Sequence, residues 1–72
     1  MEHQSVICIK NKGYEASLEA RKIYEAIPDP KAENHQQIRV IDESGEDYLF
    51  PKELFVTVVL SKPVEEAIFK EA

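Results

Sequence analysis

Residues 36–56, with the sequence QQIRVIDESGEDYLFPKELFV, decide the fold of this chain. Two short apolar runs at residues 38–41 and 48–50 flank an acidic stretch around Gly45, which is typical of a β-hairpin whose turn needs a residue that tolerates positive φ. Pro51 cannot donate to a strand ladder, so it ends the second strand, and the PKEL sequence predicts one helical turn before a further strand. Together these elements predict the second half of a small barrel.

Two further apolar runs rich in β-branched residues predict the outer strands. Residues 6–9 (VICI) are bounded by polar residues and predict the first strand. Residues 55–60 (FVTVVL) predict the last strand. Because Thr57 is its only polar residue, we expect this last strand to be largely buried.

The residues from Tyr14 to Ile27 leave two interpretations open. Their content of Ala, Leu, Glu, Lys and Arg favours a helix, although the apolar face of that helix would be poor. A strand of about six residues that ends at Ile27, before Pro28, fits as well. Residues 28–36 (PDPKAENHQ) are polar, proline-rich and without periodicity, so they predict an exposed loop.

The end of the chain changes character, so we divide it into a domain over residues 1–60 and a short C-terminal helix or tail over residues 61–72. Ser61 is suited to be the N-cap of that helix, Pro63 is tolerated in its first turn, and Lys70 lies near its negative end. A helix this short is marginal in water unless its apolar side docks on the barrel or on a second copy. That side is formed by Val64, Ala67, Ile68 and Phe69.

Length and composition limit the class of protein. The 72 residues make one domain, and a hydrophobic content of 43% is enough to form a core. The single cysteine, Cys8, has no partner for an intramolecular disulfide and lies in an apolar strand, so we expect a buried structural thiol. No run approaches the roughly 18 apolar residues of a membrane span, and we expect a soluble cytoplasmic protein. The net charge of −5 disfavours nucleic acid as a partner.

Several motifs carry a resemblance to a known group of proteins. They are CIKNxGY at residues 8–14, SL followed by KxY, and IRVIDESGEDYLFP at residues 38–51 with Phe55 after it. Across residues 6–56 the chain resembles small, mostly uncharacterised bacterial proteins that look like SH3-like barrels. The resemblance implies a mostly β fold, a five-stranded antiparallel SH3-like barrel with one 3₁₀ turn. It also implies a loop at residues 14–20 and a strand at residues 21–27, and it brings no catalytic residues.

The acidic residues of the hairpin admit two interpretations. Several carboxylates in one short loop can bind Ca²⁺ or Mg²⁺, but their spacing is not that of an EF-hand loop. We interpret Asp42, Glu43, Glu46 and Asp47 as a solvated hairpin tip. His3 and His35 have no partner at metal-ligand spacing and are interpreted as surface residues, so we expect neither a metal nor a cofactor.

The aromatic residues are numerous for so small a domain. We expect Tyr24, Phe50 and Phe55 in the core. Tyr14 and Tyr48 fall where SH3-like barrels keep their binding groove, and the alternative is that they only cover the edge of the core. The predicted groove is formed by Tyr14, Tyr48, Pro51 and Phe55. The absence of tryptophan argues against recognition of polyproline peptides.

These observations favour a non-enzymatic binding module that acts through protein contacts. There is no phosphate-binding glycine loop or serine elbow, and the chain has only two glycines. Self-association through an edge strand or the C-terminal helix is compatible with this function. The alternative is a nucleic-acid-associated domain that uses Lys10, Lys12, Arg21, Lys22 and Arg39.

Overall fold

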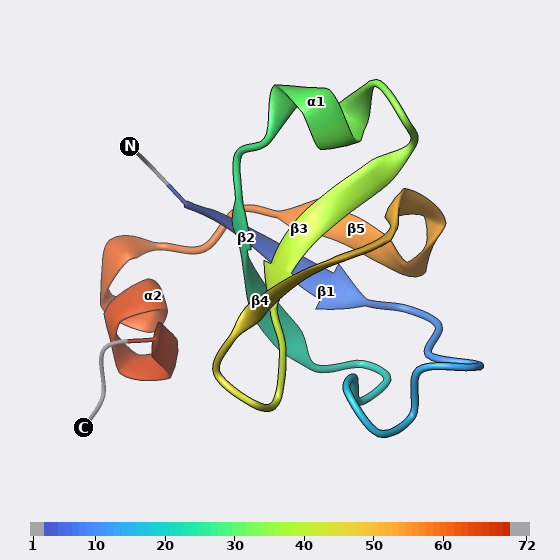
Figure 1. Cartoon of the computed structure of the whole chain (residues 1–72). Coiled ribbons are helices and arrows are strands. Elements are labelled where there is room, and N and C mark those ends of the chain that lie inside the picture. The colour runs from blue at the N-terminus through green and yellow to red at the C-terminus, as the bar shows by residue number, and fades with distance from the viewer. Residues whose placement is uncertain (1–2, 70–72) are drawn as a thin grey trace.

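The computed structural model describes residues 3–69, and it is mostly β. Five strands form one antiparallel sheet in the order β4-β3-β2-β1-β5 (Figure 1). They are β1 (Gln4–Cys8), β2 (Ile23–Ile27), β3 (Gln37–Ile41), β4 (Asp47–Pro51) and β5 (Phe55–Val58). The predicted number and antiparallel arrangement of the strands are confirmed.

The sheet is open, with β4 and β5 as its two edges. The 3₁₀ helix η1 (Lys52–Leu54) follows β4, as predicted, and redirects the chain so that β5 pairs with β1 at the far side of the sheet. In Figure 1, β3 and β4 cross over β1 and β5. Within residues 3–69 no backbone pairing joins β4 to β5, so the strands do not form the closed barrel that the resemblance implies.

The central hairpin forms as predicted. β3 and β4 pair antiparallel, and Gly45 in the turn between them has a φ of +87°. The carboxylate of Asp42 accepts hydrogen bonds from the backbone N–H and the hydroxyl of Ser44, at 2.8 and 2.6 Å. Asp42 is buried, so the interpretation of all four acidic residues as a solvated tip is wrong at this position. Its side chain organises the turn, because it supplies acceptors that water cannot reach.

The open question about residues 14–27 is resolved in favour of a loop followed by a strand. The backbone N–H groups of Ser17 and Leu18 donate to the carbonyl of Tyr14, which makes a turn that does not continue as a helix. Leu18 is almost fully buried, and the amide of Asn11 donates to its carbonyl at 2.9 Å. The loop therefore contributes a core residue to the sheet, and this residue fixes its path.

The segment at residues 28–36 is mostly exposed, as predicted, but it is not all loop, because a helical turn, α1 (Pro30–Glu33), forms there. Asp29 is its N-cap and accepts a hydrogen bond from the backbone N–H of Ala32 at 3.1 Å. Pro30 occupies the first helical position, where the missing N–H has no cost. Ala32 is buried, so this turn closes one end of the sheet.

The prediction that the last strand is largely buried is also wrong. Phe55 is buried, but Val56 is 47% exposed and the strand ends at Val58. Val59, which follows, is 97% exposed. The reason is that the Val56 side chain points to the face of the sheet opposite to Phe55, away from the core.

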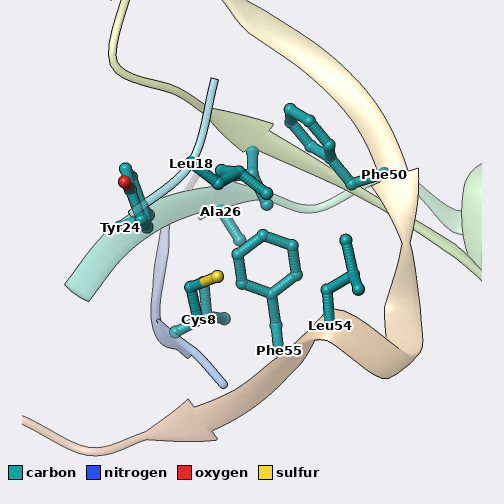
Figure 2. Packing of buried hydrophobic residues seen from close by; sticks show 9 residues of the cluster. Cys8, Leu18, Tyr24, Ala26, Phe50, Leu54 and Phe55 are labelled. Atoms are coloured by element: carbon teal, nitrogen blue, oxygen red, sulfur yellow. The ribbon is translucent and has the colours of Figure 1, made fainter. Parts of the chain in front are cut away.

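The core lies on the inner face of the bent sheet and confirms the predicted burial of Cys8, Tyr24, Phe50 and Phe55. Figure 2 shows the ring of Phe55 in the middle of this cluster, with Cys8 on one side and Leu54 on the other. The strands, the 14–20 loop and η1 each contribute to it. The buried residues that form this core cluster are Val6, Cys8, Leu18, Tyr24, Ala26, Val40, Phe50, Leu54 and Phe55.

The predicted C-terminal helix forms as α2 (Lys62–Phe69), and the Ser61 hydroxyl accepts from the backbone N–H of Val64 at 3.4 Å. Lys70 and the rest of residues 70–72 lie outside the described residues. Ile68 and Phe69 line a pocket of about 340 Å³ together with Ile23 and Ile41. Among residues 3–69 there is no helix with the length and apolarity that crossing a membrane requires.

Candidate functional site

A row of aromatic rings connects the surface of the domain to its core. The ring of Tyr14 meets that of Phe50 edge to face at 5.6 Å between centroids, and Phe50 meets Phe55 at 6.1 Å. Phe55 continues the row to Tyr24 at 6.5 Å. Edge-to-face pairs favour these ring positions beyond simple burial. Tyr14, which is 36% exposed, therefore has a fixed position at the surface end of the row.

An open pocket of about 630 Å³ lies beside Phe55, the third ring of this row. Pro51 and Phe55 line it, and both belong to the predicted groove. Pro51 precedes η1, and the backbone N–H of Lys52 donates to the carbonyl of Gln36 at 3.0 Å, which holds the helical turn against the start of β3. The complete lining is Gln36, Pro51, Lys52, Glu53 and Phe55.

Two of the four predicted groove residues, Pro51 and Phe55, lie together, and the other two are farther from them. Pro51 and Phe55 share a pocket, and Tyr14 reaches Phe55 through Phe50. Tyr48 is 48% exposed and points to the same face of β4 as Phe50, two residues away, but its hydroxyl bonds Glu46 near the hairpin tip. The pocket also contains residues that the sequence analysis did not select, Gln36, Lys52 and Glu53.

A second polar cluster joins the 14–20 loop to the hairpin tip. The hydroxyl of Tyr24 donates to Glu43 Oε2 at 2.6 Å and accepts from the backbone N–H of Glu19 at 2.7 Å. Lys22 Nζ lies 2.7 Å from the same Glu43 oxygen. The backbone N–H of Glu43 donates to the carbonyl of Ser17 at 3.1 Å. Glu43 thus has a structural role that the solvated-tip interpretation did not include.

The pKa values in this cluster follow from its geometry. The hydrogen bond from Lys22, then that from Tyr24, lowers the pKa of Glu43. Burial, then the hydrogen bond to Glu43, raises the pKa of Tyr24. Both shifts favour a neutral phenol beside a charged carboxylate. The described residues contain no group of His, Cys, Asp or Glu side chains arranged to hold a metal ion.

Arg39 links α1 to the hairpin. Its Nε donates to Asp29 at 2.9 Å, and a terminal guanidinium nitrogen donates to Asp47, also at 2.9 Å. The Ala32 N–H, then the Arg39 side chain, lowers the pKa of Asp29. Arg39 and Lys22, two of the five cations proposed for nucleic acid, are therefore engaged with carboxylates. The remaining three, Lys10, Lys12 and Arg21, are exposed around the loop after β1.

The other residues with reactive side chains are placed as follows. Cys8 is fully buried, its thiol donates to the carbonyl of Lys10 at 3.0 Å, and burial raises its pKa. This confirms a buried structural thiol. His3 Nδ1 contacts the carboxylate of Glu25, which ties it to β2. His35 is exposed after α1.

Comparisons with models of protein families, with curated proteins and with solved structures find no match to this chain.

Proposed function

We propose that this chain is a small non-enzymatic binding module that binds an extended segment of a partner protein in a groove formed by Tyr14, Tyr48, Pro51 and Phe55. The observation that carries the proposal is the shared pocket of Pro51 and Phe55, next to a ring row that ends at the exposed Tyr14. Tyrosines offer rigid apolar area with a polar hydroxyl, which suits them to protein contacts.

The proposal includes an SH3-like relationship for the fold. Its support is the strand order β4-β3-β2-β1-β5 together with a 3₁₀ helix between β4 and β5. In such a domain the groove lies where the first long loop meets the 3₁₀ turn. Tyr14 in that loop and Pro51 before η1 occupy these two places.

The chemistry of the pocket defines the ligand that fits it. Pro51 and Phe55 offer apolar walls, while Lys52 and Glu53 are exposed charges of opposite sign at the same pocket. An extended peptide with an apolar anchor residue and polar neighbours matches this arrangement. The absence of tryptophan argues that the anchor is not a proline run.

The experiment uses random linear peptides displayed on phage as the probe, selected against the whole chain. An enriched peptide is then synthesised and titrated into the ¹⁵N-labelled protein. We expect shifts of the amides of Tyr14 and residues 52–55, with Tyr48 marking the outer end of the groove. Tyr14→Ala should weaken binding by about tenfold or more, as for the removal of an interface tyrosine.

Leu49→Ala is the matched control, because Leu49 is an exposed apolar residue of β4 that points to the opposite face from Tyr48. We expect this variant to bind the peptide as the natural chain does. The proposal is wrong if no peptide is enriched, if the shifts lie away from the groove, or if Leu49→Ala weakens binding as much as Tyr14→Ala.

A further inference from the structure

The two edges of the open sheet differ in how they are protected. At the β4 edge, Pro51 lacks a backbone N–H and Asp47 carries a charge, both of which oppose the addition of another strand. At the β5 edge, residues 55–60 (FVTVVL) contain neither a charge nor a proline. An edge strand without such protection readily pairs with another strand.

The backbone groups that β5 presents outwards follow from its pairing with β1. The Ile9 N–H donates to the Leu54 carbonyl at 2.8 Å. The N–H and C=O of Cys8 form hydrogen bonds on the other side of β1, with residues that precede β2. Because antiparallel pairing alternates, the backbone groups of Val56 and Val58 face β1, whereas those of Phe55 and Thr57 are directed away from it. The Phe55 N–H is already used by the Lys52 carbonyl. Within residues 3–69, Thr57 has no backbone partner on this side.

The side chains of β5 point alternately to the two faces of the sheet. Val56 and Val58 point to the outer face, where Val56 lies opposite Ile7 and Ile7 lies opposite Ile23. Thr57 points to the inner side, opposite Val6. A strand that adds to this edge fits best if it brings apolar residues to the outer face and a small polar residue opposite Thr57.

We propose that the occupant of this edge is β5 of a second copy of the chain, paired antiparallel about a twofold axis at Thr57. In this register each Thr57 N–H donates to the Thr57 carbonyl of the other copy. Each Val59 N–H donates to the Phe55 carbonyl of the other copy. Val56 of one copy lies opposite Val58 of the other on the outer face.

Self-complementarity favours a second copy over an unrelated strand. A second β5 brings Val56 and Val58 to the outer face and places its own Thr57 opposite Thr57, so it has the side chains that an added strand needs at these positions. Although the chain carries a net charge of −5, no charge lies between Phe55 and Ser61, so repulsion at the contact is small. The pairing would also cover Val59, the most exposed of the large apolar side chains.

The test measures the mass of the whole chain by sedimentation equilibrium from about 1 µM to about 1 mM. The measured mass of the natural chain should rise with concentration from 8.3 kDa toward twice that value. Thr57→Pro removes the central donor without touching a bond to β1 and should abolish the rise. Val56→Lys keeps the backbone donors and acceptors but places a lysine near the equivalent lysine of the other copy, so it should also abolish the rise in mass. This variant tests the proposal if Thr57→Pro does not fold.

Leu49→Lys on the β4 edge is the matched control and should dimerise as the natural chain does, since Leu49 is likewise an exposed apolar residue of an edge strand. Amide hydrogen exchange at Thr57 and Val59 should slow as the protein concentration rises. A mass that stays at 8.3 kDa throughout overturns the proposal. So does a dimer that both β5 variants leave intact, because the contact then lies elsewhere, for example at α2.

Discussion

The hydroxyl of Tyr24 donates a 2.6 Å hydrogen bond to the carboxylate of Glu43, across 19 positions of the chain. Tyr24 lies on β2 and is buried, while Glu43 lies in the hairpin turn beside the 14–20 loop. The same hydroxyl accepts from the backbone N–H of Glu19 in that loop. One phenol therefore holds together three segments on which the position of Tyr14 depends.

Tyr24→Phe should lower the free energy of unfolding by about 1–3 kcal/mol, because it removes a bond to a charged acceptor and leaves the Glu19 N–H without its acceptor. Urea unfolding measures the change. Tyr48→Phe is the control, because it removes an exposed hydroxyl that bonds Glu46, and it should leave the stability nearly unchanged. Equal effects of the two substitutions would contradict the structural role of Tyr24.

Stability should fall in acid partly because of Glu43. Its pKa in the folded chain is lowered, first by Lys22 and then by Tyr24, so its contribution is present above the pKa of the unfolded chain and is lost as the pH falls through the folded value. Glu43→Gln should therefore reduce the loss of stability below about pH 5, measured by thermal unfolding at a series of pH values.

Part of this acid dependence should survive in Glu43→Gln, because the pKa of Asp29 is also lowered, by the Ala32 N–H and by Arg39. Glu46→Gln is the control for the removal of one carboxylate from the hairpin tip. If Glu43→Gln and Glu46→Gln flatten the pH profile equally, net charge explains the effect and the Lys22–Glu43–Tyr24 contact does not.

The parts of the fold that sequence reasoning predicted are those set by short-range rules. Gly45 permits a positive φ wherever the chain must turn sharply, and Pro51 ends a ladder in any sheet. Both effects act within a few residues. The α1 turn was missed because a single helical turn has no periodicity, although Asp29 followed by Pro30 is a cap signal that could have indicated it.

The parts that were predicted wrongly or missed depend on the order of strands in space. The apolar run at β5 was expected to be buried, but Val56 is exposed because its side chain points away from the core face to which Phe55 points. No local rule pairs Tyr24 with Glu43. At the candidate groove, the sequence selected Pro51 and Phe55, which share a pocket, but not Gln36, Lys52 and Glu53, which line the same pocket.

Gly45→Ala should destabilise the hairpin by about 1–2 kcal/mol, because a side chain at a φ of +87° is strained even where space is free. Gly45→Asn is the matched comparison and should cost less, since asparagine enters the left-handed region more readily. Urea unfolding of both variants ranks them. A stability of Gly45→Ala equal to that of the natural chain would show that the turn rearranges.

Cys8 should be unreactive in the folded chain, because its thiol is fully buried, donates to the Lys10 carbonyl and has a pKa raised by burial. Thiolate is the reactive form, so labelling by an aromatic disulfide reagent requires the strand to open. We expect labelling of the folded chain to be at least about a hundredfold slower than labelling in urea.

The control combines Cys8→Ala with Lys12→Cys in the exposed loop, where labelling should be fast without denaturant. Because β1 lies between β2 and β5, opening at Cys8 disrupts both pairings, and the logarithm of the labelling rate should rise in Tyr24→Phe in proportion to its lost stability. Labelling of Cys8 as fast as that of the loop cysteine would contradict the position of β1 between β2 and β5.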